Sequence, residues 1–369
     1  MKIHIMVVFI VIILVILVAG HYGLFSFWVY YFGIDSLVVK KILGICLGVL
    51  SVSFIASTLL VHWKDNFITS NLYYVSSLWL GVLWSIVLAT VITSIVIGIA
   101  NVFSSNVPMP LLASIFLGLA LVYSICGFWN AWQPQVKNIS IQIKNLPTEW
   151  QGRKAVHVSD IHLGAIHHRN FMDKVVTMIN EIQPEIVFIT GDLFDGAGKK
   201  LSHLADSLDD IKAPLGIYYI TGNHETYISL DNSLAAVAAT KTKILRDEIV
   251  EVEGVQVAGI DYPLSGMSKD IKPILTKLDQ TKPTIAMYHE PKYIDIFKEY
   301  GVNLLLSGHT HKGQVWPFNY ITSAIYKGYD YGQHKTGDLN VYTTNGVGTW
   351  GPPMRTFNRP EIVSITFSK

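Results

Sequence analysis

The stretch Val158-Ser159-Asp160-Ile161-His162-Leu163-Gly164 decides how this chain is interpreted. It places an acid and a histidine one residue apart, directly after the short run 155–158. Alone, an Asp-x-His pattern is a weak sign of a metal site, because polar residues after a strand more often form an ordinary loop. Its meaning therefore depends on the rest of the chain.

Four further polar groups follow short apolar runs farther along the sequence. They are Gly191-Asp192, Gly222-Asn223-His224-Glu225, Tyr288-His289-Glu290 and Gly308-His309-Thr310-His311. In open α/β sheets, ligands gather beyond the carboxyl ends of the strands. Five such junctions in one domain therefore predict that residues distant in sequence converge on one rim.

The composition divides the chain into two parts. Hydrophobic residues make up 50% of the 369 residues, charged residues only 15%, and the mean hydropathy is +0.38. This is too apolar for an ordinary soluble enzyme. Up to Trp132, the acidic and basic residues are only Lys2, Asp35, Lys40, Lys41, Lys64 and Asp65. We therefore predict a membrane part, residues 1–132, and a water-exposed part, residues 137–369.

The membrane part contains enough apolar sequence for four helices of about 20 residues each. The uncharged windows predict spans near 5–23, 42–62, 76–100 and 110–130. The last two are separated by residues 101–110, where polar residues and two prolines disfavour a continuous helix. The membrane part is thus predicted to be an all-α anchor.

The first apolar run has an alternative interpretation as a cleaved signal peptide. An uncleaved span is preferred, because the run is long and no clean A-x-A site follows it. With the N-terminus inside, Lys2, Lys64, Lys137 and Lys144 lie inside, and Lys40 and Lys41 lie outside. By the positive-inside rule, this slight asymmetry favours a cytoplasmic catalytic domain.

Beyond residue 137, short strands are predicted to alternate with helices. The strands are expected at 154–159, 186–190, 216–221, 255–260, 284–288, 304–307, 339–343 and 361–367. Several are apolar throughout, as expected when both faces of a sheet are covered. Amphipathic helices are expected at 170–182, with Asn170 as the N-cap, and at 268–278 and 291–299.

The polar residues at the five junctions form a ligand set of one chemical type. It comprises Asp160, His162, Asp192, Asn223, His289, His309 and His311, with His224 beside it. Cys46 and Cys126 both precede the water-exposed part, so a thiolate site there is excluded. A mixed nitrogen and oxygen set suits Mn, Fe or Zn. Because the set is too large for one ion, we expect two divalent ions that share one carboxylate.

Taken in this order, the five motifs resemble the signature of the calcineurin-like metallophosphoesterase superfamily. The ending Gly348-Thr349-Trp350-Gly351, with Pro353, Arg355 and Pro360-Glu361-Ile362, resembles its bacterial membrane-associated branch. The resemblance implies an α/β (α+β) four-layer sandwich of two mixed β-sheets flanked by helices, here preceded by the membrane helices. It also implies an integral protein of a bacterial cell membrane.

The resemblance assigns a role to each residue of the set. It implies that Asp160, His162 and His311 bind one metal, that Asn223, His289 and His309 bind the other, and that Asp192 bridges them. A hydroxide between the ions would attack phosphorus. His224 would be a catalytic residue that does not bind metal, and Asn223 would also help to hold the phosphate.

Other polar residues near the motifs receive weaker predictions. Glu225 and Glu290 are expected to support the ligands through hydrogen bonds, and His157 to lie in the core. His167 and His168 are expected in a solvated loop, with a substrate-facing position as the alternative. Lys312 is expected to touch phosphate or to point into solvent, and Asp261 to line the rim without an assigned role.

We expect a membrane-anchored metal-dependent phosphohydrolase that cleaves a phosphoester or pyrophosphate bond, with a lipid-linked substrate as one candidate. One alternative is a hydrolase of cyclic nucleotides or other soluble phosphodiesters. A nuclease is disfavoured because the water-exposed part has no basic stripe for a nucleic acid. A non-catalytic membrane sensor on the same fold is the other alternative, although such a protein would be expected to have lost ligands. Oligomeric state is left open.

Overall fold

The structure is a computed structural model that describes residues 2–105, 107–196, 201–264 and 268–369. Its chain divides into two compact units. The first comprises Met1–Trp129 with Gly351–Met354, and the second comprises Asn130–Trp350 with Arg355–Lys369. The first unit is helical, and the second contains the strands.

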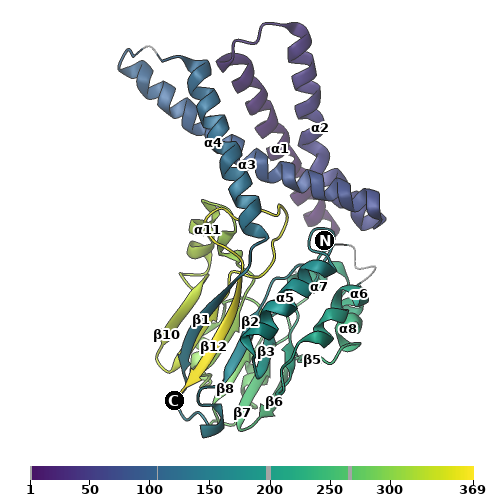
Figure 1. The fold of residues 1–369 in the computed structure, drawn as a ribbon, viewed down its shortest axis with the longest axis vertical. Coiled ribbons are helices and arrows are strands. Elements are labelled where there is room, and N and C mark those ends of the chain that lie inside the picture. The colour runs from purple at the N-terminus through teal and green to yellow at the C-terminus, as the bar shows by residue number, and fades with distance from the viewer. Residues whose placement is uncertain (1, 106, 197–200, 265–267) are drawn as a thin grey trace. The chain divides into compact units, whose positions relative to one another are not determined.

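Four long helices make up the first unit (Figure 1). They are α1 (Lys2–Tyr31), α2 (Leu37–Trp63), α3 (Phe67–Val102) and α4 (Met109–Ala131). All four are long and apolar enough to cross a membrane. This confirms the prediction of four long apolar helices before the sheets. Each is longer than its predicted span because polar residues beyond the apolar windows, such as the N-caps Ser36 and Asn66, extend the helices.

Polar side chains inside the helical unit satisfy one another. The Trp79 indole donates to His21 Nε2 at 3.0 Å and links α3 with α1. The hydroxyls of Ser57 and Ser76 lie 2.5 Å apart and link α2 with α3. Hydrogen bonds of this kind are needed where no water is available to polar groups.

Two six-stranded mixed sheets form the second unit. The first has the order β1-β12-β2-β3-β4-β5 and the second the order β10-β11-β9-β8-β7-β6. The strands of the first sheet are β1 (Gln135–Gln142), β12 (Glu361–Ser368), β2 (Lys154–Val158), β3 (Ile186–Ile189), β4 (Ile217–Tyr219) and β5 (Lys243–Ile244). Those of the second are β10 (Gly332–Thr336), β11 (Leu339–Thr343), β9 (Leu304–Ser307), β8 (Thr284–Met287), β7 (Val255–Gly259) and β6 (Glu248–Val252).

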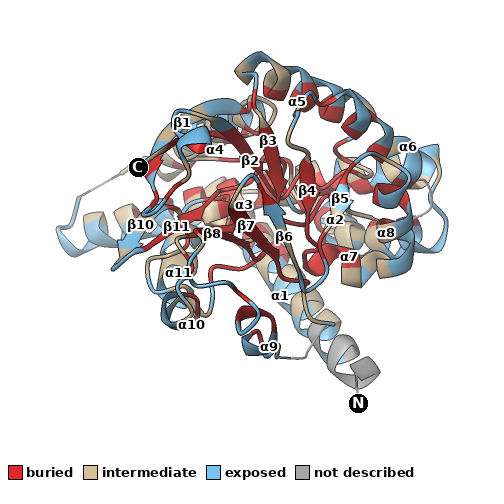
Figure 2. Ribbon diagram, turned by 90° about the horizontal axis from the view of Figure 1, so that it is seen from below, coloured by how far each residue is buried: buried red, intermediate tan, exposed pale blue. Residues whose placement is uncertain are grey.

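The two sheets pack face to face, with helices outside them (Figure 2). A core that includes Phe188, Met287 and Tyr342 fills the space between the sheets. A second core lies between the first sheet and α5 (Arg169–Ile182), α6 (Leu201–Ala205) and α8 (Leu230–Ala238). A third lies between the second sheet and α9 (Lys272–Leu275) and α10 (Ile294–Glu299). These layers confirm the predicted four-layer sandwich.

Four strands were missed by the sequence prediction: β1, β5, β6 and β10. β1 is an edge strand whose exposure alternates, and it pairs in parallel with β12. β6 and β10 are also edge strands, paired antiparallel with β7 and β11. Because an edge strand needs little apolar sequence, these segments lack the signal that identified the central strands.

Two predicted helices are shorter in the structure than expected, and one has a different cap. Only Lys272–Leu275 of the stretch 268–278 is helical, and only Ile294–Glu299 of the stretch 291–299. Helix α5 starts one residue early, with His168 at the N-cap, so the prediction of Asn170 as the cap is wrong. In all three segments the apolar spacing correctly indicated a helix, but it did not locate the residues at which the helix begins and ends.

Candidate metal centre

The five motifs lie at the ends of five strands, as predicted. Asp160 follows β2, Asp192 follows β3, and Asn223 follows β4 at the start of α7 (Asn223–Ile228). His289 follows β8, and His309 follows β9. Parallel pairing of β2, β3 and β4 in one sheet, and of β8 and β9 in the other, brings these ends to one edge of the sandwich.

The backbone turns sharply at most of the predicted ligands. Left-handed φ angles between 48° and 72° occur at Asp160, His162, Asp192, His309 and His311. Residues other than glycine rarely adopt this conformation, and such strain concentrates at functional sites.

Glycines before the ligands allow the strands to approach closely. Gly191 has a φ of 94°, and a Cβ there would lie 2.6 Å from the Gly222 nitrogen and 2.8 Å from His289 Nδ1. A Cβ on Gly308 would overlap Ser159 and Asp160. Both positions therefore require the absence of a side chain.

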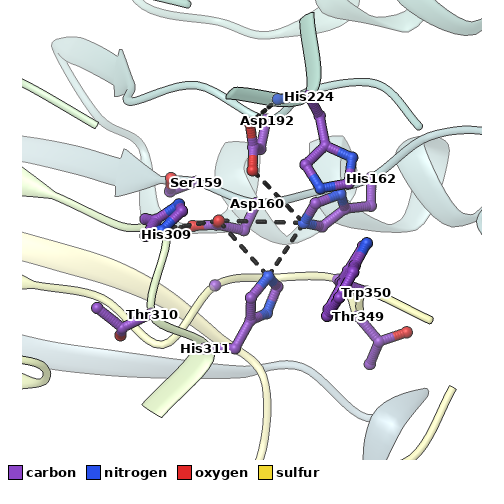
Figure 3. A network of polar contacts seen from close by, with 12 residues as sticks. Ser159, Asp160, His162, Asp192, His224, His309, Thr310, His311, Thr349 and Trp350 are labelled. Atoms are coloured by element: carbon purple, nitrogen blue, oxygen red, sulfur yellow. Dashed lines mark hydrogen bonds and ion pairs between the residues drawn. The ribbon is translucent and has the colours of Figure 1, made fainter. Parts of the chain in front are cut away.

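One ligand cluster gathers around His162 (Figure 3). Its Nε2 lies 3.0 Å from His311 Nε2, 3.9 Å from Asp192 Oδ2 and 4.0 Å from Asp160 Oδ1. His311 Nε2 is in turn 3.6 Å from Asp160 Oδ1. All four side chains are nearly or fully buried.

A second cluster gathers around Asn223 Oδ1. His309 Nδ1 lies 2.7 Å from this oxygen, and His289 Nε2 lies 3.0 Å from it. The two nitrogens are 3.2 Å apart. His289 Nε2 is also 3.2 Å from Asp192 Oδ2, the same oxygen that faces the first cluster.

These separations fit metal binding. Ligand atoms that bind one ion at about 2.1 Å lie about 3.0–3.4 Å apart. Most of the short separations fall in or near this range, and groups of His and Asp that can hold an ion occur in both clusters. With oxygen and nitrogen donors and no thiolate, the arrangement is consistent with a dinuclear site.

Charges within the site are strongly coupled. Burial opposes ionisation of Asp192, but His289 and His224 hold the pKa of its carboxyl well below the usual range. Burial likewise opposes protonation of His289, yet Asp192 raises the pKa of this ring to about 10. For His162, burial lowers the pKa to about 3, and His224 adds to the effect. Asp192 is therefore ionised and His162 neutral, the states in which they bind metal, whereas binding at His289 releases a proton.

Glu225 holds the loop that carries Asp192. Its Oε2 accepts the backbone N–H of Asp192 at 3.0 Å and of Gly222 at 2.7 Å. Its Oε1 accepts those of Leu193 at 2.9 Å and Phe194 at 3.3 Å. The carboxylate thus joins the ends of β3 and β4, which confirms the expected supporting role.

Glu290 supports the second cluster in a similar way. Its Oε1 lies 3.4 Å from His309 Nε2, so it can accept the proton on that nitrogen and leave Nδ1 for an ion. Lys292 Nζ lies 2.7 Å from the same oxygen, and the Tyr326 hydroxyl donates to it at 3.3 Å. The expected supporting role of Glu290 is confirmed as well.

His224 lies beside the first cluster rather than among its closest atoms. Its ring centroid is 4.5 Å from that of His162, and its Nδ1 is 3.3 Å from Asp195 Oδ1. Burial lowers its pKa, but Asp192 and Asp195 outweigh this and raise the pKa to about 9. The ring is therefore protonated at neutral pH. Sequence reasoning missed Asp195, although an acid three residues after Asp192 was a visible signal.

Arg355 contacts the first cluster through His311, at the ring nitrogen opposite the one that faces His162. Its buried guanidinium donates to the carbonyls of Asn345 and Gly348 at 2.7 Å each, and its Nη2 lies 3.1 Å from His311 Nδ1. The sequence motif around Arg355 was noticed only through the family resemblance. Its contact with His311 depends on a 44-residue separation that no local pattern reveals.

Several weaker predictions are corrected by the structure. His167 is not in a solvated loop: it is buried, its Nε2 lies 2.9 Å from the Thr349 hydroxyl, and its ring stacks on Phe171. His168 is exposed, as expected. Lys312 is partly exposed, and its Nζ lies 4.1 Å from the ring centroid of Tyr331, which leaves its predicted contact with phosphate or solvent a prediction.

Two further residues have structural partners. Asp261 pairs with Arg246 Nη2 at 2.7 Å and with the hydroxyl of Thr221, so its role is to join the loops after β4 and β7. His157 lies in the core as predicted, with its Nε2 2.8 Å from the Thr190 hydroxyl.

Comparison with known proteins identifies a family. The family model described as calcineurin-like phosphoesterase matches residues 153–313. An uncharacterized metallophosphoesterase of Campylobacter jejuni is 33% identical over 262 residues, which cover 69% of this chain and 68% of that protein. One from Helicobacter pylori is 32% identical over 262 residues, covering 68% and 70%.

Similarities extend to further organisms. A Danio rerio transmembrane protein with metallophosphoesterase domain is 32% identical over 272 residues, covering 68% of this chain and 61% of its own. A solved Thermus thermophilus structure aligns with 53% of this chain and 90% of its own, at a TM-score of 0.38 and 12% identity. Given the matches above, the chain belongs to the calcineurin-like metallophosphoesterase family, and the buried His and Asp cluster is its metal site.

Proposed function

We propose that the chain is a membrane-anchored hydrolase with a dinuclear metal centre that cleaves a phosphoester or pyrophosphate bond. The observation that carries this proposal is the position of Asp192 Oδ2, 3.9 Å from His162 Nε2 and 3.2 Å from His289 Nε2. One carboxylate oxygen thus faces both clusters, as a bridging ligand must.

The side chains divide into two ligand groups with one shared member. One ion would be held by Asp160, His162, His311 and Asp192, and the other by Asp192, Asn223, His289 and His309. When bound, two divalent ions supply Lewis acidity toward phosphate oxygens and an activated water. Mn, Fe and Zn all suit these donors.

His224 is proposed as the proton donor to the leaving oxygen. Asp195 fixes one ring nitrogen at 3.3 Å, and the carboxylates nearby keep the ring protonated. A protonated ring can transfer a proton or stabilise the developing charge. Asn223 is proposed to position the phosphate with its amide group while its oxygen binds metal.

Activity of purified protein tests this function. The chain would be solubilised in detergent, supplied with Mn and tested on an aryl phosphomonoester, an aryl phosphodiester, a cyclic nucleotide and a nucleotide-diphospho lipid. We expect hydrolysis of at least one substrate, abolished in Asp192→Ala and reduced about 100-fold or more in His224→Ala. Bound metal without hydrolysis of any substrate would instead favour a non-catalytic sensor.

We further propose that the chain lies in a bacterial cell membrane with the catalytic domain in the cytoplasm. The four candidate spans and the distribution of lysines support this. The exposed Asp338 offers a position for a test, as Asp338→Cys in a chain whose Cys46 and Cys126 are replaced by serine. An impermeant thiol reagent should label this cysteine only after lysis, and labelling of intact cells would refute the assignment.

A further inference from the structure

Helix α11 (Phe318–Ile325) presents apolar side chains to the outside of the catalytic domain. None of its residues is buried, and Tyr320, Ile321 and Ile325 are 66%, 54% and 62% exposed. Trp350 is also 60% exposed. Water-soluble domains rarely leave adjacent large apolar groups uncovered unless they bind something. We name these four side chains the α11 surface.

The α11 surface borders the metal centre. Helix α11 follows the turn that carries His311. Tyr326 comes directly after the helix, and its hydroxyl donates a hydrogen bond to Glu290, the carboxylate that faces His309. The side-chain amide of Gln314 forms two hydrogen bonds of 3.0 Å with the Trp350 backbone: its Nε2 donates to the carbonyl, and its Oε1 accepts from the N–H. The Trp350 ring centroid is 6.3 Å from that of His224. A ligand on this surface would therefore lie next to the reacting groups.

The chain enters the domain at this same end. β1 begins at Gln135, which pairs with Glu361, and the Glu361 N–H donates to Gly346. Two residues on, the Gly348 N–H donates to the carbonyl of Asp160, a predicted ligand. In Figure 1 the α11 end of the sandwich is opposite the end that holds the C-terminus. The first residues of the domain are thus beside the metal centre.

The connection between the candidate span α4 and β1 is short. Only residues 132–134 separate the end of α4 from the start of β1. Fully extended, three residues reach about 10 Å. The end of the domain at which β1 begins is therefore joined to α4 by a short connection.

The charge of the surrounding segment suits lipid head groups. From His311 to Tyr329 the sequence has no acidic residue, but it contains Lys312 and the exposed Lys327. Aromatic and aliphatic side chains beside lysines are typical of segments that lie in a membrane interface. Lysines near anionic lipids add attraction.

We propose that the α11 surface inserts into the head-group layer of the membrane and that the metal centre acts on phosphates carried by membrane lipids. The first part stands on the surface alone. The second part rests on the proposed hydrolase function. A soluble partner protein and a second copy of the chain are the other occupants that the test must distinguish.

Fluorescence in vesicles tests the insertion. A chain without Cys46 and Cys126 would carry an environment-sensitive fluorophore at Ile321→Cys, or at Asp338→Cys as a control at the far end of β11. In phosphatidylcholine vesicles with some phosphatidylglycerol, we expect a blue shift at position 321 and quenching by lipids with a shallow nitroxide, but neither effect at 338. Absence of quenching at 321 would refute insertion, as would a blue shift that needs high protein concentration rather than lipid.

Paired variants test the substrate class. Tyr320→Ser/Ile321→Ser/Ile325→Ser removes the apolar contact, and Tyr320→Phe/Ile321→Leu/Ile325→Leu preserves it. On a nucleotide-diphospho lipid in vesicles, the serine variant should be at least about tenfold slower than the control, equivalent to about 1.4 kcal/mol. On a soluble aryl phosphodiester the two should be equal.

The outcomes separate this inference from the proposed function. Equal rates on the lipid substrate, or equal losses on both substrates, would refute the substrate class while the hydrolase function stands. A parent chain that hydrolyses neither substrate would overturn the hydrolase function and the substrate class together. The quenching experiment would still decide whether the surface inserts.

Discussion

Replacing Glu225 with glutamine exchanges one carboxylate oxygen for an NH2 group but should disturb the whole metal centre. Each carboxylate oxygen of Glu225 accepts two backbone N–H groups, from Asp192 and Gly222 on one side and from Leu193 and Phe194 on the other. In either orientation, the glutamine NH2 would face two N–H donors that then lack an acceptor. A buried donor without a partner costs about 1–3 kcal/mol, so the expected loss of unfolding free energy is about 2–6 kcal/mol.

The same change should weaken metal binding. The Glu225 carboxylate fixes the backbone at Asp192, which faces both ligand clusters. Loss of a group that orients a ligand typically lowers metal affinity by about 10–100-fold. We therefore expect Glu225→Gln to need a correspondingly higher Mn concentration for half-saturation.

Two measurements check this prediction. Chemical unfolding of the detergent-solubilised chain, first without metal, isolates the hydrogen-bond effect, and Mn titration then measures affinity. Glu299→Gln is a matched control, because Glu299 is exposed at the end of α10. If Glu225→Gln behaved like Glu299→Gln in both experiments, the four N–H contacts would not position the centre and the reasoning would be refuted.

Three further predictions concern metal and pH. Asp192→Ala should lower the bound metal from about two ions per chain, measured by elemental analysis after desalting, and an unchanged content would exclude Asp192 as the bridge. A chelator should abolish hydrolysis and lower the unfolding temperature, both restored by Mn; unaltered melting would contradict a buried site that binds ions only in the folded state. His157 has a folded pKa of about 3, lowered from 6.5 by burial, so the unfolded chain takes up this proton first and stability falls as pH drops below about 6.5. Between about pH 7 and pH 5 the parent should therefore lose about 2 kcal/mol more than His157→Gln in denaturant titrations, and identical losses would refute the assignment.

Sequence reasoning located the metal centre because its signal is local. Each ligand group follows a short strand that is largely or fully buried, and short apolar runs followed by polar residues are visible in a single window. Parallel strands then bring such ends to one edge without further information. The positions of Asp192 and His309 therefore followed from pattern alone.

The parts that were missed depend on contacts between distant segments. His167 looked like a loop residue, but Phe171 and Trp132 cover it and Thr349 bonds to it across 182 residues. Arg355 contacts His311 through tertiary structure: the segment that contains Arg355 leads into β12, which pairs with β2 of the first sheet. Burial of a polar side chain by such contacts leaves no periodic signal in its own neighbourhood.

Hydrogen bonds between loops hold the strained backbone at the ligands. A left-handed conformation at a residue such as Asp160 or Asp192 costs about 1 kcal/mol or more. The loops carrying these residues bond to each other: the Asp160 N–H donates to Gly191, and the His162 N–H to Asp192. The Gly348 N–H then donates to Asp160 from a third loop. Because hydrogen bonds between loops hold the strained turns, the fold itself keeps the ligand atoms close to one another.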